Sequence, residues 1–478
     1  MPEPKPIQNY QSYRGLPPLA GLCTVEEAAK PGLSVEECVR RLKRFHYCFK
    51  RLHQILTARI TAEPIYELKT AFAHHAYLCA EHATALRTRI GEMREPPLGL
   101  EDVPHPALEV LFDEILCSPR ERLIGNCYFM AMLVLNVCVR DYLAETNPLT
   151  DAPSRRVLRF ALLELDDMVR WAKDVDLAIS TSSVQESQNE FRPLIDLVNA
   201  AGGLAGNAPV ADASGSLPRR YSATPYTYDP VPKRDERFTD PWNQGVNAEA
   251  FLYDETKPAR AKALMMLYKR LREIDVPEMM SSIITQTPGK PWGWYRDMSR
   301  QLWDEARHAM MGEVGFTALG VDWTQAKITF NWSYRLNTEC TPMERHGVLY
   351  FIEQGLMPKT GKRYEFEVAQ ESGLPLMATI QDFDWADEVL HSQIGRQWYV
   401  PEFASLKEAL DYGDAAWSKV LSNWSTVKEQ GLTQHENWWP TIYSQACEAE
   451  GVAPDPDVLA FNETYEAKRA DLRIVGSE

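Results

Sequence analysis

The chain has 478 residues, and 67 acidic residues outnumber 51 lysine and arginine residues to give a net charge of −16. A nucleic-acid surface needs clustered lysine and arginine, so this balance argues against a nucleic-acid partner. The longest apolar run, Tyr128 to Val139, is too short to cross a membrane. Nine cysteines without a Cys-x-x-Cys pair, and an N-terminus without an apolar signal core, predict a cytoplasmic protein with free thiols.

The first 180 residues predict helices, with no strand alternation of any length. Residues 1–35 are rich in prolines and turn residues and predict an N-terminal arm. Ser34-Val35-Glu36-Glu37 is a capping box that begins the first long helix. A helical domain is therefore expected over 36–180. Its expected helices are 36–60, 64–94, 107–117, 120–145 and 154–179.

Residues 181–246 change in character, because serine, asparagine, glycine and proline dominate them. Such a composition predicts a linker or a long wrapping loop. The tyrosines and arginines of Arg219 to Arg237 favour an ordered strap over a flexible tether.

A second helical block is expected over 247–400, followed by a helical C-terminal extension over 401–478. All tryptophans except Trp171 and Trp242 lie beyond residue 290, which predicts an aromatic interior here. The expected helices of the block are 257–286, 293–319, 342–357 and 375–399. Those of the extension are 405–429, 434–449 and 455–471.

Two of these helices carry the same acidic pattern, Asp304-Glu305-Ala306-Arg307-His308 and Asp387-Glu388-Val389-Leu390-His391. Residues three apart lie on one face of a helix, one turn apart. The carboxylate and the imidazole of each Glu-x-x-His can therefore bind the same metal ion. In di-metal carboxylate bundles two helices carry Glu-x-x-His and each of the other two carries a lone Glu.

The distance of each residue from the connecting turn selects the two lone glutamates. Ligands of one metal site on neighbouring antiparallel helices must lie equally far from that turn. Glu278 lies about as far before the turn near residue 291 as Glu305 lies after it, and it continues the apolar stripe that includes Leu264 and Leu271. Glu273 is the alternative, although the nearby Lys269 and Arg270 suggest a solvated pair.

The same argument selects Glu353 as the partner of Glu388. Oxygen-rich ligation with one nitrogen per metal suits iron or manganese better than zinc. The alternative without a metal site is two solvated helices that carry Glu-x-x-His by chance. The predicted metal ligands, which would also be the catalytic residues, are Glu278, Glu305, His308, Glu353, Glu388 and His391.

The sequence Asp-Glu-Ala-Arg-His resembles the Asp-Glu-x-Arg-His motif of oxygen-activating, ferritin-like di-iron proteins, which include the multicomponent monooxygenases and the small subunit of ribonucleotide reductase. The resemblance covers about residues 260–400. It implies a ferritin-like four-helix bundle there. Together with the helical domain over 36–180 and the C-terminal helices, the whole chain is expected to have an all-α fold. It also implies that Asp304 orients His391 and that Asp387 orients His308. Leu390 departs from the family pattern, where arginine is frequent.

Three further residues on these helices are candidates for the surroundings of the metals. His346 lies two turns before Glu353 and could be an extra ligand, a second-shell donor or a satisfied core residue. Tyr350 could be an oxidisable phenol, a pocket hydrogen-bond donor or core. Asp384 lies one turn before Glu388 and is expected beside the ligands.

The 36–180 domain carries weaker signals of the same kind. Half of the ten histidines lie between His46 and His82, and Glu164 and Asp167 are spaced as in Glu-x-x-His. A degenerate ferritin-like bundle that has lost its metal is one interpretation. An ordinary helical domain with a packing or dimerisation role is the other.

The expected function is an O2-activating non-haem di-iron enzyme that oxidises a small organic substrate by hydroxylation, N-oxygenation, desaturation or oxidative cleavage. The expected cofactor is two iron ions, with manganese or a mixed pair as an alternative. No nucleotide or flavin fingerprint is present, so reductant is expected from a separate reductase or ferredoxin, or from the substrate. We also expect a homodimer. The alternatives are a ferroxidase or iron-storage protein and a helical scaffold with a vestigial site.

Overall fold

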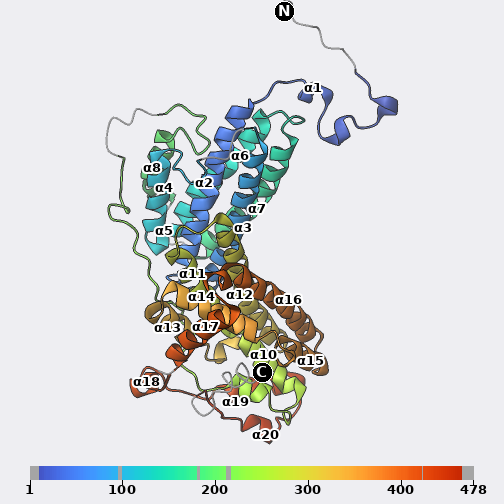
Figure 1. Ribbon diagram of the computed structural model, residues 1–478, viewed down its shortest axis with the longest axis vertical. Coiled ribbons are helices and arrows are strands. Elements are labelled where there is room, and N and C mark those ends of the chain that lie inside the picture. Colours follow the sequence, from blue (N-terminus) through green and yellow to red (C-terminus); the bar gives the residue numbers. More distant parts are fainter. Residues whose placement is uncertain (1–9, 95–98, 180–183, 211–216, 422–423, 466–478) are drawn as a thin grey trace, which may run out of the picture. The chain divides into compact units, whose positions relative to one another are not determined.

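The computed structural model (Figure 1) describes residues 10–94, 99–179, 184–210, 217–421 and 424–465. All regular structure in these residues is helical, which confirms the all-α class. The chain divides into two compact units. Unit 1 comprises Met1–Ile55 and Leu78–Thr227, and unit 2 comprises Leu56–Tyr77 and Tyr228–Glu478. The division falls within two long helices and also between Thr227 and Tyr228, inside the stretch 181–246 that composition set apart.

The expected helices of the first 180 residues are present, with ends that differ by at most two residues. Ser34 accepts a hydrogen bond from the backbone N–H of Glu37 (3.2 Å), as the capping box requires. Helices α2 and α3 contain the division between the units. The helices up to residue 200 are α1 (Val25–Ala28), α2 (Val35–Arg59), α3 (Tyr66–Glu92), α4 (Pro106–Cys117), α5 (Arg120–Ile124), the π-helical η3 (Gly125–Met132), α6 (Leu133–Glu145), α7 (Ala152–Ile179) and α8 (Val184–Ala200).

Aromatic side chains join the helices of unit 1. Phe45 on α2 meets Tyr142 on α6 with ring centroids 6.0 Å apart, and Tyr128 in η3 meets Trp171 on α7 at 5.3 Å. His82 on α3 forms an ion pair with Glu164 on α7 (2.7 Å). The histidines of this unit therefore have structural partners. Neither of the metal-ligand groups found among the described residues lies in unit 1.

Helix α8 occupies the beginning of the stretch that composition assigned to a linker, so that assignment is wrong for 184–200. Leu194 and Leu197 are buried on α8, which packs against α4. The described residues 201–210 and 217–247 beyond it are non-helical, and one part of them is fixed by a carboxylate. The carboxylate of Glu114 accepts hydrogen bonds from the backbone N–H groups of Arg220, Tyr221 and Ser222.

Among the described residues, the stretch Arg120–Glu145 is long and apolar enough to cross a membrane by length and composition. Of its most apolar window of 18 residues, 61% is buried inside the protein. The core helix of a globular unit has the same character, so the expectation that the chain does not enter a membrane stays a prediction.

Unit 2 contains the predicted second block and the C-terminal extension. The expected 257–286 helix is two helices, α10 and α11, which separate at Glu273 and Ile274. Helices α9, α13 and α15 lie in segments where none was expected. The expected 455–471 helix is present only over 456–459; residues 460–465 are non-helical, and the part beyond 465 lies outside the described residues. The helices are α9 (Ala248–Leu252), α10 (Ala259–Arg272), α11 (Asp275–Gln286), α12 (Trp292–Ala318), α13 (Asn331–Glu339), α14 (Pro342–Gly355), α15 (Tyr364–Glu371), α16 (Pro375–Trp398), α17 (Leu406–Leu421), α18 (Trp424–Glu429), α19 (Trp439–Glu450) and α20 (Pro456–Leu459).

Helix α12 packs against α10, α11 and α16, and α14 packs against α11, α16 and α17. The contact between α12 and α10 is close. A Cβ atom on Gly312 would lie 2.5 Å from the backbone nitrogen of Leu271, so only glycine fits there. The predicted stripe residues Leu264, Leu267 and Leu271 are all buried in this contact.

The buried histidines of unit 1 predict a pH-dependent stability. Burial lowers the pKa of His46 to about 3 and the pKa of His53 to about 4, whereas the unfolded value is about 6.5. Below pH 6.5 the unfolded chain therefore binds more protons, and stability falls as the pH falls through this window. We expect each histidine to contribute up to about 1.4 kcal/mol per pH unit. The unfolding free energy, measured with urea between pH 7.5 and 4.5, should change less with pH in His53→Leu than in the wild type. An equal dependence on pH in the two proteins would contradict this explanation.

Candidate metal centre

Helices α12 and α16 place the two Glu-x-x-His pairs opposite each other. Glu305 and His308 on α12, and Glu388 and His391 on α16, are each at most 2% exposed. The rings of the two histidines lie 5.8 Å apart, centroid to centroid. Proline in the first turn of α16 and a Thr341–Glu344 capping box on α14 fix the starts of these helices.

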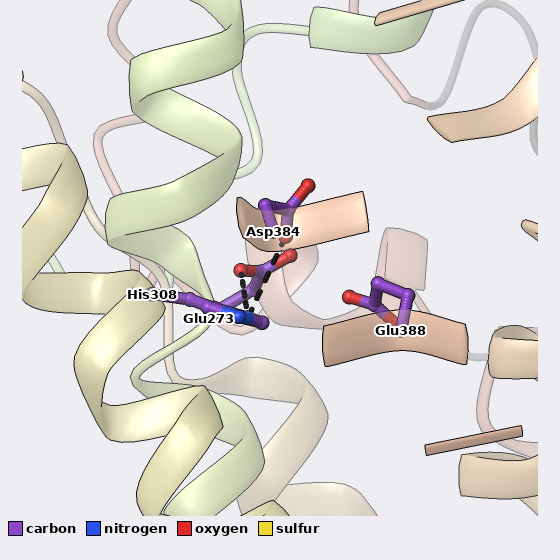
Figure 2. A group of neighbouring side chains, drawn as sticks. All are labelled: Glu273, His308, Asp384 and Glu388. Carbon is purple, nitrogen blue, oxygen red and sulfur yellow. Dashed lines mark ion pairs between the residues drawn. The ribbon is translucent and has the colours of Figure 1, made fainter. Parts of the chain in front are cut away.

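The acidic and histidine side chains form two groups, in each of which the ligand atoms lie within 4.8 Å of one another. Both groups contain Glu388. The first group is Glu273, His308, Asp384 and Glu388, and Figure 2 shows it with the ion pairs that His308 makes to Glu273 and Asp384. The second group is Glu305, Glu353, Glu388 and His391.

In both groups the Nδ1 atom of the histidine faces the carboxylates. His391 Nδ1 lies 3.1 Å from Glu305, 3.6 Å from Glu388 and 3.9 Å from Glu353. His308 Nδ1 lies 3.4 Å from Glu273, 3.6 Å from Asp384 and 3.7 Å from Glu305. Neither Nδ1 atom has a hydrogen-bond partner with good geometry among the described residues. Buried polar atoms rarely lack a partner, so two such atoms that face clustered carboxylates fit a bound cation.

The opposite ring nitrogens are held by the aspartates that precede the glutamates. His308 Nε2 lies 3.1 Å from Asp387, and His391 Nε2 lies 3.4 Å from Asp304. The structure therefore contains both of the crossed contacts that the family resemblance implies. Arg307 donates to Asp304 and to Asp387, and joins the two. A proton held on Nε2 leaves the Nδ1 lone pair free for a metal.

The acids strongly affect the protonation of both histidines. Burial opposes the charged form of His308, but the carboxylates of Asp387, Glu273 and Glu305 around its ring raise its pKa to about 10. The pKa of His391 is likewise raised well above its ordinary value by Asp304, Glu305 and Glu388, although burial lowers it. Clustered carboxylates thus attract positive charge into this region.

The carboxylates also differ among themselves. Burial and the nearby Glu388 raise the pKa of Glu353 well above its ordinary value. Burial also opposes the charged form of Glu388, but Lys362 holds the pKa of Glu388 well below its ordinary value. The surroundings of the second group therefore favour the ionised form of Glu388 and disfavour that of Glu353.

Glu278 does not join the cluster, so its predicted placement is corrected. Its carboxylate pairs with Lys69, accepts hydrogen bonds from Arg234 (2.8 and 2.9 Å) and from Ser333 (2.7 Å), and is fully buried. Burial raises the pKa of Glu278, but Arg234 and Lys69 outweigh it and lower the pKa to about 2.

Glu273 takes the predicted place of Glu278. The break between α10 and α11 changes the depth at which each residue meets α12, and the depth argument assumed one continuous helix. The pair that Glu273 makes with Arg270 (2.8 Å) exists, but Arg270 is 1% exposed, so it is an interior pair and not a solvated one.

The remaining candidates divide between the cluster and its surroundings. Asp384 belongs to the first group. His346 belongs to neither group; it lies against the rings of Trp294 and Tyr399, and burial lowers its pKa to about 4. Tyr350 is buried, packs against Tyr399 and donates to Gln354 (3.4 Å).

Sequence reasoning missed three residues that contact the cluster. Lys362 lies 2.9 Å from Glu388, Arg270 pairs with Asp384, and Gln301 donates to Glu353 (3.0 Å). Gln301 lies one turn before Glu305 on the same face, so helical spacing could have found it. Lys362 lies in a connection between helices, where the sequence gives no comparable signal.

A cavity of about 170 Å³ reaches the second group. Glu305, Glu353 and Glu388 line one part of it, and its walls are mainly apolar, including Trp332, Leu336, Val348, Leu349, Phe351 and Trp417. The carboxylates of the second group therefore face space that a small molecule can enter.

Comparison of the chain with models of known protein families, with curated proteins and with solved structures finds no match. The assignment of this centre consequently depends on its geometry and chemistry.

The two glutamates that competed for the same role can be separated by substitution. We expect Glu273→Gln to bind about one ion fewer per chain after anaerobic loading with excess Fe(II), because it removes a carboxylate from the first group. Glu278→Gln should keep its ions but lose about 3 kcal/mol or more of unfolding free energy, because Lys69 and Arg234 lose a buried charge partner. Metal analysis measures the bound ions, and urea unfolding measures the free energy. Loss of metal in Glu278→Gln but not in Glu273→Gln would show that Glu278 is the ligand.

Proposed function

We propose that the chain is a ferritin-like di-iron enzyme that uses O2 to oxidise a small organic molecule. The observation that carries the proposal is the pair of buried acid-histidine groups that share Glu388. In each group an imidazole Nδ1 atom faces the carboxylates and an aspartate holds the other nitrogen. A chance pattern on two solvated helices would not bury these atoms together.

The origin of the ligands supports a ferritin-like arrangement. Glu273 comes from the end of α10 and Glu353 from α14, while α12 and α16 each supply Glu-x-x-His. This is the distribution found in di-iron carboxylate bundles, in which two helices give a lone Glu and two give Glu-x-x-His.

The donor set fits two ions of iron, or of manganese, or one of each. Each group offers three carboxylates, of which Glu388 is shared, and one imidazole. Hard oxygen donors with a single nitrogen suit these metals, whereas structural zinc sites are usually tetrahedral and rich in cysteine or histidine. Reduced iron ions held there would supply electrons to O2 for the oxidation of a substrate.

The residues of the chain have distinct parts in this chemistry. Asp304 and Asp387 hold the histidine rings in one orientation and keep the proton on Nε2. The carboxylates of Glu305, Glu353 and Glu388 can change their binding mode as charge develops. The apolar walls exclude water from the reacting atoms.

The cavity indicates the size and polarity of the substrate. A protein cavity of about 150 Å³ lined by apolar residues binds benzene. A cavity of about 170 Å³ walled by two tryptophans and several aliphatic residues fits a largely apolar molecule of one ring or a short chain. An apolar pocket beside the acid-histidine groups favours an oxidase or oxygenase over iron storage. We propose a separate reductase or ferredoxin as the electron donor.

Aerobic turnover tests the reaction. The protein loaded with Fe(II) and supplied with reductant should consume O2 and oxidise a member of a pool of small apolar metabolites, detected by mass spectrometry. Glu305→Ala should consume O2 only at the background rate, because Glu305 faces both histidines. Continued oxidation of Fe(II) well beyond two ions per chain without any organic product would indicate a ferroxidase instead.

Filling the cavity tests where the substrate binds. Val348→Phe places a ring in the cavity and should lower kcat/KM about tenfold or more, because the ring takes space that the substrate needs and a loss of about 1.4 kcal/mol already gives that factor. The metal content should not change, because Val348 belongs to neither metal-ligand group. Val420→Phe, at a buried position outside the cavity lining, is the control for general overpacking. Equal losses in both variants would contradict a binding role for the cavity.

A further inference from the structure

Lys362 brings a positive charge into the first metal-ligand group. Its side chain is 1% exposed, and its Nζ atom lies 3.0 Å from both oxygens of Asp384 and 2.9 Å from Glu388. The carboxylate of Glu273 lies 3.9 Å away. These are the three carboxylates of the first group, so the ammonium contacts the same oxygens that an ion there would use.

The backbone fixes this position. Lys362 lies in the short segment η5 (Lys359–Arg363) between α14 and α15, and its N–H donates to the carbonyl of Leu356 (3.1 Å). A Cβ atom on Gly361 would lie 2.2 Å from that same carbonyl oxygen, so the neighbouring residue must be glycine. The lysine therefore enters the interior on a constrained segment and is not a flexible surface side chain.

Among the described residues, no lysine or arginine pairs with the two unshared acids of the second group, Glu305 and Glu353. Of that group Lys362 contacts only the shared Glu388, and Gln301, a neutral amide, donates to Glu353. The first group also has Arg270, which pairs with Asp384 and Glu273. A lysine and an arginine thus offset the three carboxylates of the first group, whereas the ion pairs of Glu305 and Glu353 are to histidine.

We propose that the ammonium of Lys362 takes the place of a metal ion in the first group, so that the centre binds its two ions in sequence. The first ion binds tightly to Glu305, Glu353, Glu388 and His391. The second ion binds to Glu273, His308, Asp384 and Glu388 only when Lys362 leaves these carboxylates. The inference depends on the proposed metal centre but not on any oxidation reaction.

Anaerobic titration with Mn(II), followed by equilibrium dialysis and by the electron paramagnetic resonance of free Mn(II), tests the order of binding. In the wild type we expect one tight ion and a second ion bound at least tenfold more weakly. Lys362→Met removes the ammonium at similar length, and it should strengthen the second ion about tenfold or more and bring the two affinities together. If Lys362→Met does not fold, the wild-type titration by itself still tests the order of binding.

Two control variants separate the charge from other effects. Lys362→Arg keeps a positive charge and should keep the sequential binding of the wild type. Lys269→Met removes another buried lysine of unit 2, whose partner Glu365 belongs to neither metal-ligand group, and it should also bind like the wild type. Two ions of equal affinity in the wild type, or no change in Lys362→Met, would overturn the inference alone. No bound metal in any folded variant would overturn the metal centre as well.

Discussion

The crossed hydrogen bonds between two histidines and two aspartates set the register of unit 2. Asp304 and His308 lie on α12, their partners His391 and Asp387 lie on α16, and each contact runs from one helix to the other. A slip of one residue would rotate a helix face by about 100° and separate both pairs. Arg307 joins the two aspartates, so the contacts form one network instead of two independent bonds. The positions of Glu305, Asp384 and Glu388, the cluster carboxylates on these two helices, follow from this register.

A core with so many ionised groups is stable only if each charge has a partner, because an unpaired buried charge costs several kcal/mol. Unit 2 meets this requirement with separate networks. Lys69 and Arg234 neutralise Glu278, and Lys269 neutralises Glu365. The acid-histidine cluster differs from these, because the cations that reach it contact mainly the first group. The remaining acidic charge distinguishes a site for a cation from an ordinary buried salt bridge.

The sequence predicted the long helices and the facing Glu-x-x-His pairs because both depend on local periodicity. It did not predict the break at Glu273 and Ile274, although Pro277, which lies within the first turn of α11 and has no N–H to donate to the carbonyl of Glu273, is a signal for it. The choice of Glu278 failed for a second reason. Its partners Lys69 and Arg234 are distant in the sequence, and periodicity within one helix contains no information about them. The same holds for Lys362, which reaches the cluster from a connection, and for α8, whose apolar stripe lies in a stretch of mainly polar composition.

The cavity and the internal cations are both distributed unevenly about Glu388. All three carboxylates of the second group line the cavity, and Glu273 and Arg270 of the first group line it as well, whereas Asp384 and Lys362 do not. An organic molecule in the cavity would therefore approach every carboxylate of the second group, but only Glu273 and the shared Glu388 of the first. In the first group the ammonium of Lys362 pairs with the shared Glu388 and would offset part of its negative charge. In the proposed enzyme the two metal-ligand groups would consequently differ in role. The second group would face the substrate, and the first group would set the net charge of the centre.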